Sequence, residues 1–185
     1  DAGLVVIDLA KPAAPRVVGR AATPGSARGI AVAGRYAYVA DDGRGGLAVI
    51  DVAQPQAPRL VSTVQLKGNA QAVVAAGRYV YIAAGTAGLA ILDVSNPAHP
   101  TIAGTVDTPG DSRDVAVTDG RAFVADTAGV QVIDVGNPRA PKIIGSANSL
   151  YDAVTVSAAG HYIYVGNSMG SGVASNSAGD QIGSA

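Results

Sequence analysis

The chain has 185 residues, 13 Lys and Arg against 14 Asp and Glu, and 48% hydrophobic residues. This balance argues against nucleic-acid binding, because neutralising phosphates needs a positive surplus, and the apolar fraction is too high for intrinsic disorder. No apolar run approaches the ~20 residues of a membrane helix. Because cysteine is absent, disulfides, thiolate nucleophiles and cysteine-bound metals are excluded.

Read from the N-terminus, the chain repeats one set of strand-like segments. The first of them, 3–8, is a glycine, four mostly apolar residues and an aspartate, and it recurs at 46–51, 88–93 and 129–134, about 42 residues apart. Two prolines follow each copy in fixed register: Pro12 and Pro15, Pro55 and Pro58, Pro97 and Pro100, Pro138 and Pro141. The second proline precedes an apolar run at 16–18, 59–61, 101–103 and 142–144.

Two further apolar runs complete the unit. One run lies at 29–32, 72–75, 114–117 and 153–156, and the other at 36–39, 79–82, 121–124 and 162–165. All the runs are short, rich in Val, Ile and Tyr, and bounded by Gly, Pro, Asn or Asp, which is typical of strands. Four short strands per repeat predict an all-β fold, a β-propeller with four-stranded blades of about 42 residues. A lone blade cannot bury both faces of its sheet, so the unit has to repeat.

The unit Gly-Leu-x-Val-Ile-Asp-Val-x-x-Pro-x-x-Pro resembles the LVIVD repeat of bacterial and archaeal surface or secreted β-propellers. The resemblance covers roughly residues 1–166 and stops near Ser175, where a fifth Val-Ile-Asp strand is due but 172–176 read Gly-Val-Ala-Ser-Asn. The family carries no general catalytic constellation. The resemblance therefore implies a propeller and a prokaryotic location at the cell surface or outside the cell, and it implies no reaction.

The number of blades follows from where the repeat starts and stops. The chain opens on the third strand of one unit, runs through three whole units, and ends on the first two strands of another. Residues 1–167 are thus predicted to form three whole blades and two half-blades, and 168–185 a loop or linker rich in Gly and Ser. An arc of a larger propeller is the favoured arrangement. A closed four-bladed ring, in which the half-blades pair, is the alternative.

An aspartate ends each Val-Ile-Asp strand. These residues are Asp8, Asp51, Asp93 and Asp134. Because one stands in every unit before a proline-rich turn, we expect a structural turn in which the carboxylate accepts backbone N–H groups. A ring of cation-binding carboxylates is the alternative.

The sequence contains only weak matches to catalytic and metal-binding motifs. Residues 166–170 match Gly-x-Ser-x-Gly around Ser168, but no helical pattern follows, and the chain has only two histidines, His99 and His161. We therefore expect no catalytic residues. Two scattered histidines without cysteine predict no zinc site, and the acidic turns 41–43 and 107–111 do not match a calcium loop, so no metal and no cofactor are expected.

Variable loops are the favoured binding region. In a propeller, the loop before the innermost strand and the loop between the second and third strands share one face, and binding residues favour loops held by a rigid frame. The candidate binding residues there are Arg28, Gln71, Arg113 and Asp152 from the first loop set, and Asp41, Asp42, Arg44, Asp126 and Asn167 from the second.

Three functions remain open. The favoured one is a non-catalytic cell-surface or secreted propeller that serves as a protein-interaction or structural scaffold. The second is a propeller hydrolase or lyase whose site would use Asp and Arg of the loop face with Ser168 or His161. The third is a subunit of an extracellular assembly, in which the exposed strands at the chain ends pair with another chain. A protein partner or self-association is expected, with no nucleic acid and no membrane span.

Overall fold

Sixteen β-strands make up the structured part of the computed structural model, which describes residues 3–43, 46–148 and 152–168. They are β1 (Gly3–Asp8), β2 (Arg16–Ala22), β3 (Ser26–Ala33), β4 (Tyr36–Asp42), β5 (Gly46–Asp51), β6 (Arg59–Val64), β7 (Ala72–Ala76), β8 (Tyr79–Ala83), β9 (Leu89–Asp93), β10 (Thr101–Val106), β11 (Ser112–Thr118), β12 (Arg121–Asp126), β13 (Gly129–Asp134), β14 (Lys142–Ala147), β15 (Asp152–Ala159) and β16 (Tyr162–Ser168). The predicted linker, apart from Ser168, lies outside the described residues.

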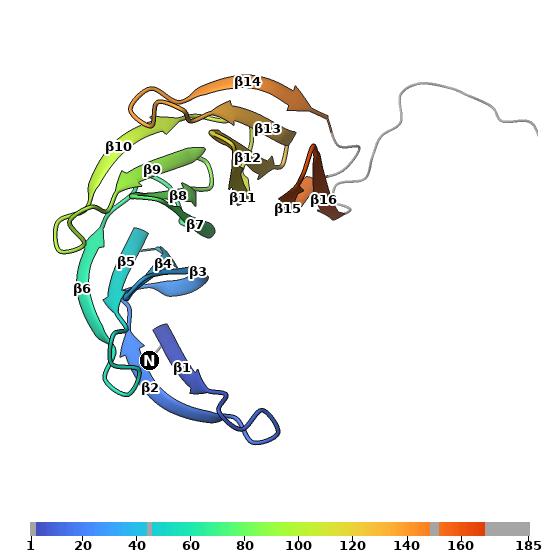
Figure 1. Ribbon diagram of the computed structural model, residues 1–185. Helices are drawn as coiled ribbons and strands as arrows, with labels where there is room; N and C mark the ends of the chain where they lie inside the picture. The colour runs from blue at the N-terminus through green and yellow to red at the C-terminus, as the bar shows by residue number, and fades with distance from the viewer. Residues whose placement is uncertain (1–2, 44–45, 149–151, 169–185) are drawn as a thin grey trace, which may run out of the picture.

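The strands form five antiparallel sheets that follow one another along the chain. Three sheets have four strands, β3–β6, β7–β10 and β11–β14, and two have two strands, β1–β2 and β15–β16. The predicted all-β propeller architecture is confirmed. Figure 1 shows the sheets fanned around an open hollow, with β3, β7, β11 and β15 nearest to it and β2, β6, β10 and β14 on the outside. The two end sheets are not hydrogen-bonded to each other, so the described strands form an open arc and not a closed four-bladed ring.

Tight turns join the first and second strands of each whole sheet, and also β15 and β16. The pairs Ala33↔Tyr36 and Ala76↔Tyr79 close loops of two residues that begin with Gly34 and Gly77, at φ of 58° and 60°. The β11–β12 turn instead has positive φ at both Asp119 (49°) and Gly120 (70°). These conformations match the right-handed twist of the strands, and they require residues that tolerate the left-handed region.

The core lies between the sheets and not within any one of them. Tyr38 and Val49 of the β3–β6 sheet pack against Val80, Ile82 and Leu92 of the next sheet. All five side chains are nearly or fully buried. The β7–β10 sheet makes the same kind of contact with β11–β14. Each sheet therefore excludes water from its faces only where a neighbour covers it, as the repeat predicts.

The proline turns form a second contact between neighbouring sheets. A Cβ at Gly104 on β10 would lie 2.4 Å from the carbonyl oxygen of Pro138 and 2.9 Å from Cδ of Pro141. Gly19 on β2 is equally close to the turn at Pro55 and Pro58. On β6, the hydroxyl of Ser62 donates a hydrogen bond of 2.7 Å to the carbonyl oxygen of Pro97. The proline turn of each sheet thus seats on the outer strand of the sheet before it.

Replacing Gly104 by alanine should lower the free energy of unfolding by about 1–3 kcal/mol, because the added methyl group overlaps backbone that cannot easily move. The matched control is Gly145→Ala at the same repeat position, where a Cβ would meet nothing closer than Val132 Cβ at 4.0 Å. Urea denaturation of both variants at low protein concentration checks this. Equal loss of stability in the two variants would contradict the seating of the proline turn on Gly104.

Candidate binding face

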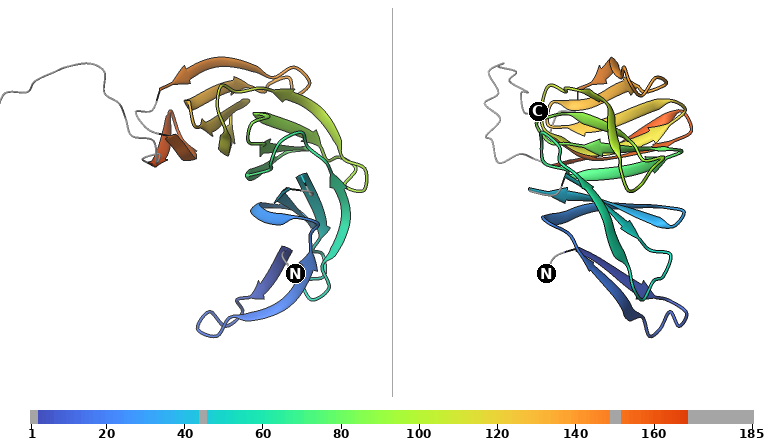
Figure 2. Two further views of the ribbon diagram at one scale, coloured as in Figure 1. Left: turned by 180° about the vertical axis from the view of Figure 1, so that it is seen from behind. Right: turned by 90° about the vertical axis from the view of Figure 1, so that its left-hand side faces the viewer.

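Two sets of loops meet on one face of the arc, here called the upper face. It comprises the starts of the inner strands β3, β7, β11 and β15 and the loops β4–β5, β8–β9 and β12–β13. Asp41 Oδ2 accepts the backbone N–H of Gly25 at 2.7 Å, and Gly85 and Ser112 exchange two backbone hydrogen bonds of 3.0 and 3.1 Å. Figure 2 shows from the side that loops gather at two opposite ends of the stacked sheets.

Two of the predicted binding residues are buried inside this face. Asp41 and Asp126 both have 0% exposure. Asp41 also accepts the hydroxyl of Thr23 at 2.9 Å, and Asp126 accepts the backbone N–H of Ala128 at 2.8 Å. From the sequence, both are candidate binding residues, whereas the structure shows them covered. Instead, the two carboxylates accept hydrogen bonds from N–H and hydroxyl groups of the loops that cover them. A partner therefore has no access to Asp41 or Asp126.

The other predicted binding residues that the structure describes lie at or near the surface. Arg28 and Asp42 form an ion pair of 3.1 Å within one sheet, and Arg28 remains 54% exposed. Arg113 and Asp152 approach to 3.5 Å and connect the last two sheets. The remaining three are the half-buried Gln71, the exposed Asn167 and Arg44, which lies outside the described residues. The upper face therefore presents two loosely held ion pairs and two neutral amides.

Sequence reasoning missed a carboxylate on the upper face that joins two sheets. Asp114 on β11 accepts the hydroxyl of Thr155 at 2.7 Å and the backbone N–H of Val156 at 2.9 Å, both from β15. Gly29 and Ala72 occupy the equivalent positions, each paired with an alanine of the second strand. The departure from a small residue was the available signal. In a repeat protein, a position where one unit differs in residue type from the other units is a candidate for a contact specific to that unit.

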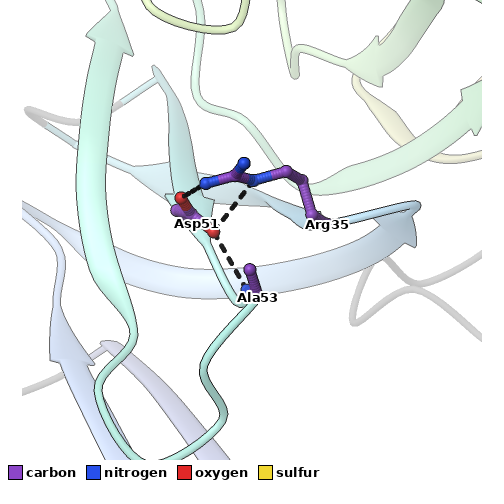
Figure 3. A network of polar contacts seen from close by, with 3 residues as sticks. All are labelled: Arg35, Asp51 and Ala53. Atoms are coloured by element: carbon purple, nitrogen blue, oxygen red, sulfur yellow. Dashed lines mark hydrogen bonds and ion pairs between the residues drawn. The ribbon is translucent and has the colours of Figure 1, made fainter.

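The strand-ending aspartates lie at the opposite side of the arc, here called the lower face. In each, Oδ1 accepts the backbone N–H two residues further on at 2.9 Å, from Ala10, Ala53, Ser95 and Gly136 in turn. Asp51 also pairs with Arg35 and Asp93 with Arg78 (Figure 3 shows the first). Each arginine lies over the ring of the following tyrosine, 5.4 Å from Tyr36 and 5.3 Å from Tyr79. These contacts fasten the strand ends and the hairpin tips together.

These contacts should make stability fall in acid. The hydrogen bond from Arg35 lowers the pKa of Asp51, and the hydrogen bond from Arg78, followed by those from Ser95, lowers the pKa of Asp93. A carboxyl with a lowered folded-state pKa contributes stability that is present above about pH 4 and is lost as pH falls below it. We expect wild type to lose more stability than the Arg35→Gln/Arg78→Gln double variant between about pH 5 and about pH 2. Both pairs are exposed, so the difference should be small and should shrink in salt. Urea midpoints measured across that range test this, and parallel curves for the two proteins would contradict it.

The described residues separate Ser168 from His161 and form no metal-ligand cluster. Ser168 ends β16 and His161 lies just before its first residue, seven residues or roughly 23 Å away along an extended chain. Within 3–43, 46–148 and 152–168, no three His, Asp or Glu side chains gather as metal ligands. That same part of the chain has no helix long and apolar enough to cross a bilayer.

The repeat, the register and the stacked four-stranded sheets define a β-propeller repeat protein. The chain belongs to the LVIVD repeat family, whose repeat matches residues 1–23, 24–65, 67–108 and 109–149. The first match covers β1–β2, and each of the others covers one whole four-stranded sheet. The family resemblance predicted from the sequence is therefore confirmed, and the structure adds β15–β16, which folds as a further half-sheet beyond the matched residues.

Solved structures share the fold at low sequence identity. The computationally designed Ika4 protein matches with a TM-score of 0.66 at 9% identity, over 79% of this chain and 88% of its own. A functionally unknown protein from Desulfotomaculum acetoxidans matches with 0.67 at 13% identity, over 87% of this chain and 55% of its own. BamB from Moraxella catarrhalis matches with 0.62 at 17% identity, over 82% of this chain and 47% of its own. The chain thus spans about half the length of the two natural proteins. No curated protein matches its sequence.

Proposed function

We propose that this propeller is a non-catalytic scaffold at the cell surface or outside the cell, and that it binds a protein partner through the upper face. The observation that supports this most is the change of residue at equivalent inner-strand starts, from Arg28 to Gln71 to Arg113 to Asp152. A short inner strand follows or contains each of these positions in every unit. A rigid frame with varied polar side chains at one end is the arrangement that binding loops use.

The electrostatics of the face fit a polar protein partner. Arg28 and Asp42 are paired but accessible, so a partner can compete for either charge at low cost, since exposed ion pairs contribute little stability. Gln71 and Asn167 supply neutral donors and acceptors. The buried Asp41 and Asp126 keep the loops fixed, which reduces the entropy lost on binding.

Surface location is supported by the resemblance of the unit to repeats of bacterial and archaeal surface or secreted propellers. The hydrolase alternative loses its best candidates, because Ser168 and His161 are separated by the length of β16. Accessibility of the chain to protease added to whole cells tests the location. Complete protection in intact cells with cleavage after lysis would contradict it.

An alanine scan tests the binding face. The Arg28→Ala/Gln71→Ala/Arg113→Ala variant should bind the partners captured by wild type at least tenfold more weakly. These three side chains lie on the upper face and do not belong to the hydrophobic core. The matched control is Arg59→Ala/Arg121→Ala/Lys142→Ala, which removes exposed charges from the lower face. Both variants should keep the wild-type unfolding midpoint within the error expected for surface changes. Equal binding by the two variants would overturn the proposal.

A further inference from the structure

A small cavity on the lower face lies between two arginines of the β3–β6 sheet. It measures about 200 Å³. Its polar lining consists of Arg35 from the β3–β4 turn, Asp51 at the end of β5, Gln54 from the proline turn and Arg59 at the start of β6, and the rest of the lining is alanine. Both arginines are exposed, so a ligand can reach the cavity from solvent.

Arg35 is held in place before any ligand arrives. Its Nε and one terminal nitrogen donate to the carboxylate of Asp51, and its guanidinium lies over the ring of Tyr36. Figure 3 shows the other terminal nitrogen turned away from Asp51. No oxygen of the described residues accepts a hydrogen bond from that nitrogen. Its N–H groups are therefore available to a ligand, in an orientation that is already fixed.

Arg59 adds a second positive charge that has no counter-ion in the described part of the chain. It stands opposite Asp51 in the register of β5 and β6, but both oxygens of Asp51 already accept hydrogen bonds from Arg35 or Ala53. The hydrogen bond from Arg35 is the main cause of the lowered pKa of Asp51, and the charge of Arg59 adds to it, so Arg59 lies close by. Two guanidinium groups against one carboxylate leave the cavity with an excess of positive charge.

The side-chain amide of Gln54 is a third donor. The equivalent residues of the next two sheets, Asn96 and Asn137, use Oδ1 to accept a backbone N–H two residues further on, from Ala98 and Arg139, at 3.2 Å. Gln54 has a longer side chain, and within the described residues its amide makes no such bond. Its NH₂ group can therefore donate into the cavity that Gln54 lines.

Among the three whole sheets, this pair of arginines occurs in β3–β6 alone. In β7–β10 the hairpin arginine Arg78 is present, but Thr101 stands in the place of Arg59. In β11–β14 Lys142 stands there, but Gly120 takes the place of the hairpin arginine. Two sheets form without the pair, so the blade does not need it for folding. The pair therefore indicates a contact that is specific to this unit.

We propose that the cavity between Arg35 and Arg59 binds a phosphate group. The three donors come from a hairpin, a strand start and a proline turn, so they approach a ligand from different directions. A phosphate presents at least three acceptor oxygens in a tetrahedral arrangement, whereas a carboxylate presents two oxygens in one plane. Arginine donates charge-assisted hydrogen bonds to phosphate. Because the cavity opens to solvent, the phosphate can be free or can belong to a larger molecule. This inference does not depend on what the upper face binds.

Titration of the full chain with inorganic phosphate, followed by NMR of the backbone amides, tests the site. At about pH 8, where histidine side chains are uncharged, we expect saturable shifts at Arg35, Ala53, Gln54 and Arg59. The dissociation constant should be on the order of 1 mM, because the donors are exposed. Sodium chloride at the same ionic strength should not reproduce the shifts, since it screens charges without occupying the cavity.

Variants separate a site from a general effect of positive charge. Arg59→Gln and Arg35→Gln should each raise the dissociation constant about fivefold, the upper end of what an exposed ion pair contributes. Arg78→Gln is the matched control and should leave the constant unchanged. Its side chain is 57% exposed against 59% for Arg35 and is paired in the same way, but its sheet lacks the second cation. Urea midpoints show whether each variant is folded.

Three further ligands identify the chemistry and its source. Malonate, a dianion with planar carboxylates, should bind at least fivefold more weakly than phosphate. Glycerol phosphate that binds as tightly as inorganic phosphate would indicate a soluble ester. Sedimentation with vesicles of phosphatidylglycerol but not of phosphatidylcholine, lost in Arg59→Gln, would indicate a lipid headgroup. Shifts that do not saturate, equal effects of Arg59→Gln and Arg78→Gln, or malonate that binds as tightly as phosphate would overturn the proposal.

Discussion

Replacing Leu92 by alanine is expected to lower the free energy of unfolding by about 2–5 kcal/mol, which is a large part of the stability of a domain of this size. Leu92 is fully buried in the cluster that joins the β3–β6 and β7–β10 sheets. Removing its branched end leaves a void between two sheets whose backbones are fixed by hydrogen bonds on both sides. Urea denaturation with circular dichroism measures the loss.

The control uses the same repeat position at the end of the arc. Ile7→Ala should lower the free energy of unfolding by less than about 1 kcal/mol, because Ile7 is already 52% exposed. The contrast separates burial by a neighbouring sheet from any intrinsic preference of the strand. Similar losses at Leu92 and Ile7 would contradict an architecture in which each sheet is covered by the next.

The second large effect is expected at Asp41. Asp41→Ala should destabilise the chain by about 2–4 kcal/mol, because the half-buried Thr23 hydroxyl and Gly25 N–H would lose the buried side chain that accepts their hydrogen bonds. The β2–β3 loop should loosen at the same time, since these two bonds tie it to the end of β4. Chemical denaturation gives the first quantity, and amide hydrogen exchange of residues 23–25 gives the second.

Asp42→Ala is the adjacent control. Asp42 pairs with the exposed Arg28, so its removal should cost about 0–1 kcal/mol and should leave exchange in the β2–β3 loop unchanged. If Asp42→Ala proved as damaging as Asp41→Ala, the assignment of the buried carboxylate as the one that holds the loop would fail.

Most of the fold could be predicted from the sequence because the same pattern of strands and turns recurs in each unit. A strand that ends in Asp, two prolines in fixed register and two further apolar runs recur together in every unit, so each run overlaps one observed strand. The observed strands extend up to four residues beyond the predicted runs. The order of strands also follows, since tight turns allow only antiparallel neighbours. The curvature of the arc depends on the shapes of packed side chains between sheets, which spacing along the chain does not encode.

The binding face was less predictable than the fold. Position along the repeat placed Arg28, Asp42 and Arg113 at one end of the sheets, but it gave no measure of burial. Asp41 follows an apolar strand as Asp42 does, yet the inward step of the pleat buries one and leaves the other near solvent. Asp114 joins strands 41 residues apart, a contact that only the packing of neighbouring sheets creates.

Amide hydrogen exchange across the whole chain tests the central claim most directly. If sheets are protected by their neighbours, β8 and β9 should exchange slowest, because their sheet is covered on both sides, and β1 and β16 should exchange fastest among the strands. Uniform protection of all sixteen strands, or slowest exchange in the two end sheets, would contradict the account.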